Sequence, residues 1–259
     1  MNLITVKGLV IRTTDVRESD RLITIFTEEM GVISAMAKGA RSLKSRQMSS
    51  TMQFCYASFV LYRKGENYWV KESELIESFF DIRRSIEGLA LAGYIVEILS
   101  YVTVAEAERE LLRLSLNSLY AISSGKYQLE KIKAAFEVRA VSILGFMPDV
   151  ISCTDCGEKS GDFYFDIMGG YLRCYKCQSE LAKSNADSGD PHESRIISIV
   201  SDGAKAALGY CIYCPIEKIF SFQISDEDMH LFSRATEEYL VNQLERSFKT
   251  LDFYKELTR

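Results

Sequence analysis

The chain has 259 residues, of which 47% are hydrophobic, and a formal net charge of −5. This length allows one large domain or two to three smaller ones with buried cores. Because no apolar run of about eighteen residues occurs and the N-terminus does not resemble a signal peptide, we expect a cytoplasmic protein without a membrane segment. The acidic balance also argues against a protein that coats nucleic acid with its whole surface.

Basic residues are concentrated near the N-terminus. Residues 31–71 contain seven lysines and arginines but only one acid, Glu66. The segments 80–152, 153–192 and 193–259 each carry a net negative charge. If the chain binds nucleic acid, we therefore expect the contact to lie within residues 31–71.

The first eighty residues contain five short β-branched and apolar runs separated by polar turns. They predict strands at 3–13, 21–27, 32–37, 54–62 and 68–74. Five short strands within about eighty residues are typical of a small closed barrel. The OB-fold is the commonest five-stranded type, and an SH3-like barrel would have a similar pattern.

From Ser85 onward, apolar residues recur at the three- and four-residue spacing of helices. Helices are predicted from Leu89 to Val102, through the leucines before Gly125, and over 126–144. A polar linker is expected at 184–194, then a helical segment over 195–208 and a final helix from 225 to 257. The predicted fold is α+β, with an OB-type barrel at 1–80 followed by an all-helical domain at 81–259.

Two Cys-x-x-Cys pairs flank a predicted hairpin that is inserted at about residues 150–180. Each pair places two thiolates on one tight turn, and the hairpin brings the turns together. This spacing predicts one structural Zn²⁺ ion held by Cys153, Cys156, Cys174 and Cys177. The alternatives are two disulfides or four buried thiols, and a cytoplasmic protein disfavours the disulfides.

A basic, Gly- and Ser-containing loop follows the third predicted strand. Its cations are spaced to follow successive phosphates, and its backbone can approach a nucleic-acid strand closely: Lys38, Arg41, Lys44 and Arg46. Charge alone adds three further candidates, Arg63, Lys64 and Lys71. The alternative is a solvated surface loop, because runs of charge are commonly just solvent-exposed.

Aromatic residues interleave with this charge, and those that face outward could stack on bases. For any one of them a core position is the better interpretation: Phe54, Tyr56, Tyr62, Tyr68 and Trp69. A third Cys-x-x-Cys, Cys211 and Cys214, lies in an apolar stretch, which favours buried structural cysteines over a redox dithiol. No catalytic motif supports an enzyme, and four thiolates would leave a zinc ion no open position for catalysis.

These features together resemble the RecO family of bacterial recombination mediators, and the resemblance covers essentially the whole chain. The segments that carry it are Leu9 to Arg12, Glu18 to Thr27, Gly31 and Ala37 to Arg46, then Phe136 to Ala140 and Gly145 to Gly157. Each segment is modest alone, but their order and spacing are specific.

The resemblance implies a protein of DNA repair without catalytic activity. RecO-type proteins bind single- and double-stranded DNA and anneal complementary strands. They associate with RecR and with single-stranded DNA-binding protein, and so help RecA to load, which implies work near the nucleoid. The family's DNA contacts lie largely on the barrel and its basic loops. Some members lack the cysteines, so the metal cannot be required for the family's core activity.

An alternative of another class remains open. A zinc-stabilised scaffold that binds only proteins would share every feature except the function of the basic loop. The acidic hairpin and helical segments are expected to bind protein partners or to stiffen the fold, whereas the barrel is expected to hold DNA.

Overall fold

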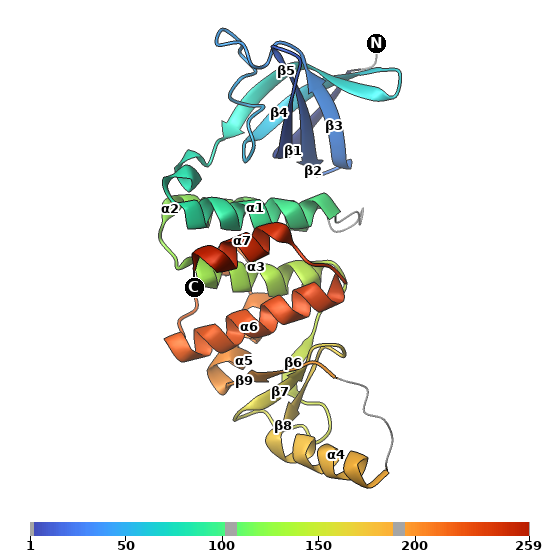
Figure 1. The fold of residues 1–259 in the computed structure, drawn as a ribbon, viewed down its shortest axis with the longest axis vertical. Coiled ribbons are helices and arrows are strands. Elements are labelled where there is room, and N and C mark those ends of the chain that lie inside the picture. Colours follow the sequence, from blue (N-terminus) through green and yellow to red (C-terminus); the bar gives the residue numbers. More distant parts are fainter. Residues whose placement is uncertain (1–2, 102–107, 189–194, 259) are drawn as a thin grey trace. The chain divides into compact units, whose positions relative to one another are not determined.

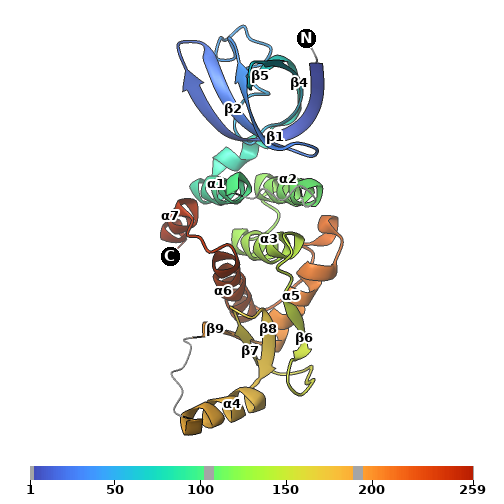
Figure 2. The same ribbon diagram turned by 90° about the vertical axis from the view of Figure 1, so that its right-hand side faces the viewer.

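The computed structural model describes residues 3–101, 108–188 and 195–258. The chain forms two compact units, Met1–Lys126 together with Phe248–Arg259, and Tyr127–Ser247. Both are drawn in Figures 1 and 2. Within the described residues, no helix is both long and apolar enough to cross a membrane.

Five strands in the first unit form a closed barrel, which confirms the predicted OB-type fold. They are β1 Leu3–Val16, β2 Asp20–Thr27, β3 Gly31–Ala37, β4 Tyr56–Lys64 and β5 Asn67–Glu77. Their order around the barrel is β1-β2-β3-β5-β4, and the β3–β5 pair is parallel whereas the other pairs are antiparallel. Figure 2 shows the strands curving into a ring. Closure leaves no strand edge unpaired.

The barrel core is built from alternate residues of every strand. In β4, for example, Ala57, Phe59 and Leu61 point inward and are fully buried. Gly8 of β1 is needed for closure, because a Cβ there would lie 2.4 Å from Ile25 Cγ2 and 2.8 Å from the Phe26 carbonyl oxygen. Any larger residue at position 8 would force β1 and β2 apart.

The remaining elements of the first unit are helical. They are η1 Phe80–Arg84, α1 Ile86–Tyr101, α2 Glu108–Ser124 and α7 Lys249–Leu257. Helix α7 packs on α1, where the ring of Tyr94 meets that of Phe248 edge-on at 5.5 Å and Glu97 accepts a hydrogen bond from the backbone N–H of Thr250. The predicted end of the first helix, Val102, lies outside the described residues.

The second unit combines a small sheet with helices, of which three lie outside the inserted region that carries the cysteines. These three are α3 Leu129–Ile143, α5 Asp202–Tyr213 and α6 Asp226–Gln243, with the short η2 Ile216–Lys218 between the last two. The strands are β6 Asp149–Cys153, β7 Phe163–Asp166, β8 Tyr171–Cys174 and β9 Ile197–Val200, in the order β6-β8-β7-β9. The predicted hairpin is β7–β8, and two further strands extend it to a sheet within a region predicted to be otherwise helical.

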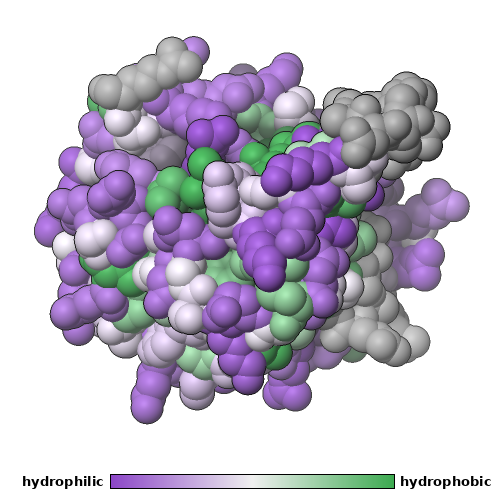
Figure 3. Space-filling model, turned by 90° about the horizontal axis from the view of Figure 1, so that it is seen from below, coloured by the Kyte–Doolittle hydropathy of each residue, from purple (hydrophilic) through white to green (hydrophobic). Residues whose placement is uncertain are grey.

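One face of this sheet supplies the core of the second unit. Phe163, Phe165, Leu172 and Val200 are almost completely buried, and the ring of Phe165 lies 5.1 Å from that of Tyr239 on α6. Beyond β8 the chain forms α4, Tyr175–Ser188. Figure 3 looks onto the side of the molecule where α4 lies in Figure 1, and hydrophilic residues dominate that view.

Three local predictions in this unit are wrong. Residues 175–188 form α4, so the predicted linker begins inside a helix; its part at 189–194 lies outside the described residues. Ile197–Val200 is a strand, because β-branched residues precede Ser201, which caps α5 by accepting a hydrogen bond from the Ala204 N–H.

The predicted final helix is broken in two, because α6 ends at Gln243. Glu245 adopts a positive φ of 49°, and the N–H of Arg246 bonds back to the Val241 carbonyl. This is the hydrogen-bond pattern of a Schellman motif, formed here without the usual glycine.

A buried ion pair joins α3 to α6. The Lys133 ammonium lies 3.0 Å from Glu137 and 2.8 Å from Glu237, and Thr236 donates a hydrogen bond to Glu137 at 2.8 Å. The two carboxylates raise the pKa of Lys133, although its burial alone would lower it. The contacts that link the two helices are those from Lys133 to Glu237 and from Thr236 to Glu137, whereas Lys133 and Glu137 both belong to α3.

Candidate metal centre and nucleic-acid interface

The structure brings the four predicted cysteines together. Their Sγ atoms all lie within 4.8 Å of one another, and Cys156 and Cys174 are 3.7 Å apart. Cys153 ends β6, Cys174 ends β8, and Cys177 lies in the first turn of α4. A tetrahedral ion with bonds of about 2.3 Å separates its sulfurs by roughly 3.8 Å. The cluster could therefore hold a metal ion.

Backbone hydrogen bonds hold the two cysteine pairs side by side. The N–H of Cys153 donates to the Glu158 carbonyl at 2.7 Å, and the N–H of Gly157 returns to the Cys153 carbonyl at 3.0 Å. Gly157 takes a positive φ of 77°, which glycine adopts without strain. The Thr154 N–H donates to Leu172 of β8 at 2.8 Å, so the first turn is tied to the strand that carries the second pair.

The protonation of the cluster is uneven. Burial raises the pKa of the Cys153 thiol, but backbone N–H groups of Cys174, Cys156 and Asp155 outweigh it and lower the pKa to about 6. The pKa of Cys177 is raised, first by its interaction with the Cys156 thiol and then by burial. One thiolate is therefore favoured without a cation, and a bound cation is what would let all four ionise.

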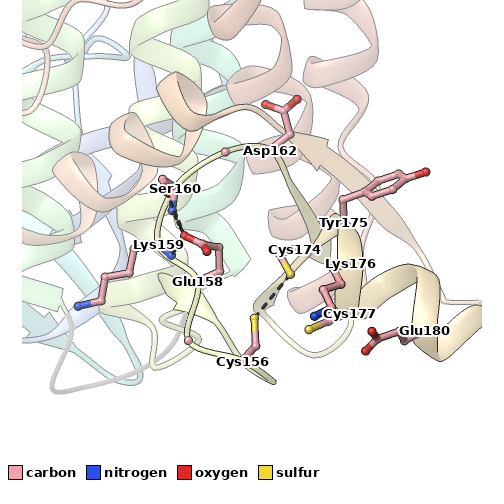
Figure 4. Close-up of a pocket in the computed structure, with 12 residues that line it drawn as sticks. Cys156, Glu158, Lys159, Ser160, Asp162, Cys174, Tyr175, Lys176, Cys177 and Glu180 are labelled. Carbon is pink, nitrogen blue, oxygen red and sulfur yellow. Dashed lines mark hydrogen bonds between the residues drawn. The ribbon is translucent and has the colours of Figure 1, made fainter.

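An open hollow of about 1030 Å³ lies beside the cysteines (Figure 4). Its wall is the loop from Cys156 to Asp162, where the Glu158 carboxylate accepts hydrogen bonds from Lys159 and Ser160. The lining mixes both signs of charge, with Lys176 and Glu180 on the α4 side. Four thiolates would complete the tetrahedral shell of a bound ion and leave it no open position.

Of the other cysteines, Cys55 and Cys211 are buried and Cys214 is half-buried. Cys211 is fully buried, and its thiol faces the Ile219 carbonyl at 3.8 Å. Burial raises the pKa of Cys211, and likewise the pKa values of Cys214 and Cys55. A redox dithiol needs a lowered thiol pKa. The structure thus supports the structural interpretation of Cys211 and Cys214.

The predicted basic loop joins β3 to β4 and is pinned to the barrel. The Gly39 N–H donates to the Asp20 carboxylate at 2.8 Å, and the Gln47 amide donates to the Lys71 carbonyl at 3.1 Å. Further along, the Ser50 and Ser73 hydroxyls lie 2.7 Å apart. All four cations of this loop are exposed to solvent on a supported backbone, namely Arg41 and the three cations Lys38, Lys44 and Arg46.

Arg41 differs from these three cations, because the protein itself engages its guanidinium. The group lies 3.2 Å from the Asp15 carboxylate and donates to the carbonyls of Arg17 and Glu18, both at 3.1 Å. Arg41 therefore braces the β3–β4 loop against the β1–β2 turn. The sequence carries no signal for this role, since Asp15 lies twenty-six residues away.

The three remaining candidates lie along β4 and β5. Arg63 and Lys64 end β4 at the tight turn, where Arg63 donates to the Gly65 carbonyl at 3.1 Å. Lys71 is exposed on β5, and its ammonium lies 3.8 Å from the carboxylate of Glu72, which is also exposed. The seven predicted cations thus fall in three places on one barrel: the β3–β4 loop, the β4–β5 turn and β5.

Comparison with known proteins gives one consistent result. The model of the family "Recombination protein O N terminal" matches residues 1–79, and that of "Recombination protein O C terminal" matches residues 83–252. A "DNA repair protein RecO" of Acetivibrio thermocellus is 35% identical over 261 residues, spanning 100% of this chain and 99% of that protein. A protein of the same name from Alkaliphilus metalliredigens is 28% identical, and the match covers 98% of this chain and 100% of that protein. One from Clostridium kluyveri is 33% identical, and the match covers 67% of this chain and 68% of that protein.

Proposed function

Because the chain belongs to the recombination protein O family, we propose that it acts in DNA repair as a mediator protein without catalytic activity of its own. The observation that carries the proposal is the match of both family models, which together cover nearly the whole chain. In this proposal the protein binds single- and double-stranded DNA and anneals complementary strands. With RecR, it helps RecA to load onto DNA that is coated by single-stranded DNA-binding protein, and it works in the cytoplasm at the nucleoid.

The proposal divides the work between the barrel domain, 1–80, and the helical domain, 81–259. Exposed cations on the barrel support its role in DNA binding: Lys38, Lys44, Arg46, Arg63, Lys64 and Lys71. Each can meet a phosphate oxygen, and together they outnumber the acids in this stretch. Arg41 serves this surface by bracing the loop. The acidic helical domain is proposed to receive the protein partners.

We propose Zn²⁺ as the metal of the cysteine cluster. Four sulfur ligands in tetrahedral reach suit zinc or iron, and two short knuckles on a small sheet are typical of structural zinc sites. Metal analysis of the purified protein should find one zinc ion per chain. Iron with visible absorption would instead indicate an iron centre.

A salt-dependent binding titration tests the DNA surface. The triple variant Lys38→Glu, Lys44→Glu, Arg46→Glu leaves the Arg41 brace intact. We expect its affinity for single-stranded DNA to fall, and the slope of log affinity against log salt to flatten by about 2, because each lost phosphate contact removes about 0.7 from that slope.

A matched control reverses three exposed lysines outside the barrel, Lys183, Lys218 and Lys249. It makes the same change in net charge and should leave the salt slope unchanged. If the two triple variants bind equally well, the loop is not the DNA surface. If the unaltered protein binds no DNA at low or at high salt, the protein acts instead as a scaffold that binds only proteins.

A further inference from the structure

A row of apolar side chains runs across the outside of the five barrel strands. Strand register pairs Leu22 with Met36, Met36 with Trp69, Trp69 with Tyr62, and Tyr62 with Leu3. The chain neighbours of these residues belong to or pack on the barrel core: Ile23, Ala35, Val70, Leu61 and Ile4. Since side chains alternate along a strand, all five residues of the row face outward. We call them the outer row.

The outer row is partly open to solvent. Leu3 is exposed, and the other four members are half-buried. The adjacent outward pair of β2 and β3 is Thr24 and Ser34, which is the polar composition expected of a barrel exterior. The outer row is thus an apolar line on a surface that is otherwise polar at this point.

Two aromatic rings form the middle of the outer row. The rings of Tyr62 and Trp69 are nearly parallel, 23° apart, with their centroids separated by 6.5 Å. The Lys64 ammonium lies 5.8 Å from the centre of the Trp69 ring. A pair of near-parallel rings beside a lysine at a tight turn combines a stacking surface with a phosphate contact.

The position of the outer row within the fold points to its ligand. In OB-type barrels, the face of strands 2 and 3 and the loops joining strands 1–2 and 4–5 hold oligonucleotides. The row crosses β2 and β3, and its aromatic middle on β5 and β4 lies beside the β4–β5 turn. Residues 31–71, which supply Met36, Tyr62 and Trp69, carry seven basic residues against one acid, so the surroundings suit a polyanion.

We infer that Trp69 and Tyr62 form a platform on which bases of an unpaired DNA strand stack, while Lys64 and neighbouring cations meet its phosphates. This inference rests on the proposed function, because it presumes that the barrel binds DNA. The bases of a duplex are already stacked on one another, so the platform can engage only unpaired nucleotides. It would let the barrel prefer single strands, which phosphate contacts alone do not do.

The chain supplies its own probe for this site, because Trp69 is its single tryptophan. Its fluorescence should be quenched on titration with a thymidine oligonucleotide. An abasic oligonucleotide of equal length, which keeps the phosphates but has no bases, should bind more weakly and quench little, and a duplex should quench little. Equal quenching by the thymidine and abasic strands would overturn the inference, as would binding of the thymidine strand without quenching.

Variants separate stacking from general binding. Trp69→Ala and Tyr62→Ala should each weaken binding of the single strand about 5- to 150-fold, with the duplex affinity and the salt slope unchanged. Trp69→Phe keeps an aromatic face and should retain most of the affinity. Tyr120→Ala removes an exposed tyrosine from α2, in the same unit, and should change nothing.

The outcomes distinguish the alternatives. If the unaltered protein binds DNA but the alanine variants bind single strands equally well, the outer row does not stack on bases and is left as a protein-docking surface. Equal losses for single strands and duplexes would also overturn the inference. If the unaltered protein binds no DNA, the proposed function itself fails. If Trp69→Ala does not fold, the Tyr62→Ala variant and the quenching titration of the unaltered protein still test whether bases stack on the two rings.

Discussion

The barrel and the small sheet of the second unit reach stability by different means. The barrel pairs every strand on both sides and encloses twelve buried residues in one core. The sheet β6-β8-β7-β9 is open at both edges, its strands are four or five residues long, and four cysteines gather at one end. A sheet that small needs a cross-link or a packed partner to persist. The barrel is thus stabilised by its own closure and core, whereas the sheet packs on α6 and has the cysteine cluster at one end.

The largest effect is expected from a substitution that removes one of the four clustered cysteines. Cys174→Ser should abolish metal binding, a loss on the order of 10 kcal/mol for a structural zinc site. Hydrogen exchange should accelerate in β8 and α4, because both elements carry ligands, while barrel amides and DNA affinity stay unchanged. Metal analysis and hydrogen-exchange mass spectrometry check this.

The control for that experiment is Cys214→Ser, which changes a cysteine outside the cluster and should leave the metal content as it was. A Cys174→Ser protein that stays fully folded but loses DNA binding would reverse the roles assigned to the two regions. The cysteine cluster would then be part of the DNA surface.

A smaller loss of stability is expected when the core of the barrel is disrupted. Phe59→Ala empties a fully buried position and should lower the free energy of unfolding by about 3–5 kcal/mol. Urea denaturation followed by Trp69 fluorescence reports on the barrel itself. Val60→Ala, the half-buried and outward neighbour, should cost no more than about 1 kcal/mol. Similar losses for both would contradict the inward and outward assignment in β4.

The smallest expected effect on stability concerns Asp228, in the second unit. Its carboxylate accepts hydrogen bonds from Ser201 and Ser225, the N-cap residues of α5 and α6. These bonds, first that from Ser201, lower the pKa of Asp228. The stabilisation that the Asp228 carboxylate gives the folded state is therefore present at pH values above 3.8, the pKa of this group in the unfolded chain. It is lost as the pH falls through the lower pKa of the folded state.

Asp228→Asn should accordingly cost about 1 kcal/mol at neutral pH and progressively less below pH 4. Urea denaturation at a series of pH values measures this. Asp226→Asn changes an exposed carboxylate in the same helical turn and provides the control. If both variants lose stability in parallel at all pH values, Asp228 does not link the two caps.

Most of the barrel could be predicted because alternation of apolar and polar residues is a local signal. The cysteine cluster could be predicted for the same reason, since each pair lies on one turn and seventeen residues separate the pairs. The short strand β9 and the polar helix α4 have only weak sequence signals. The end of α6 at Gln243 has none, because Glu245 takes the positive φ that a glycine usually adopts at this position, and no glycine marks it.

The features that could not be predicted depend on register between distant strands. The brace from Arg41 to Asp15 and the outer row through Met36, Trp69 and Tyr62 exist only once β1 to β5 are aligned. Alternation identifies two faces of each strand, but it does not say which outward residues become neighbours. That is why the aromatics could not be separated into core and surface before the structure was known.

The return of α7 to the first unit has a consequence for protein synthesis. This unit is made from residues at both ends of the chain, and α7 covers α1. Translation proceeds at about 5–20 residues per second, so the barrel can close early, whereas α1 must wait for the final residues to emerge. Until then the apolar side of α1 around Tyr94 stays uncovered, as it would permanently in a product truncated before Phe248. Such a product would present the surface that chaperones bind.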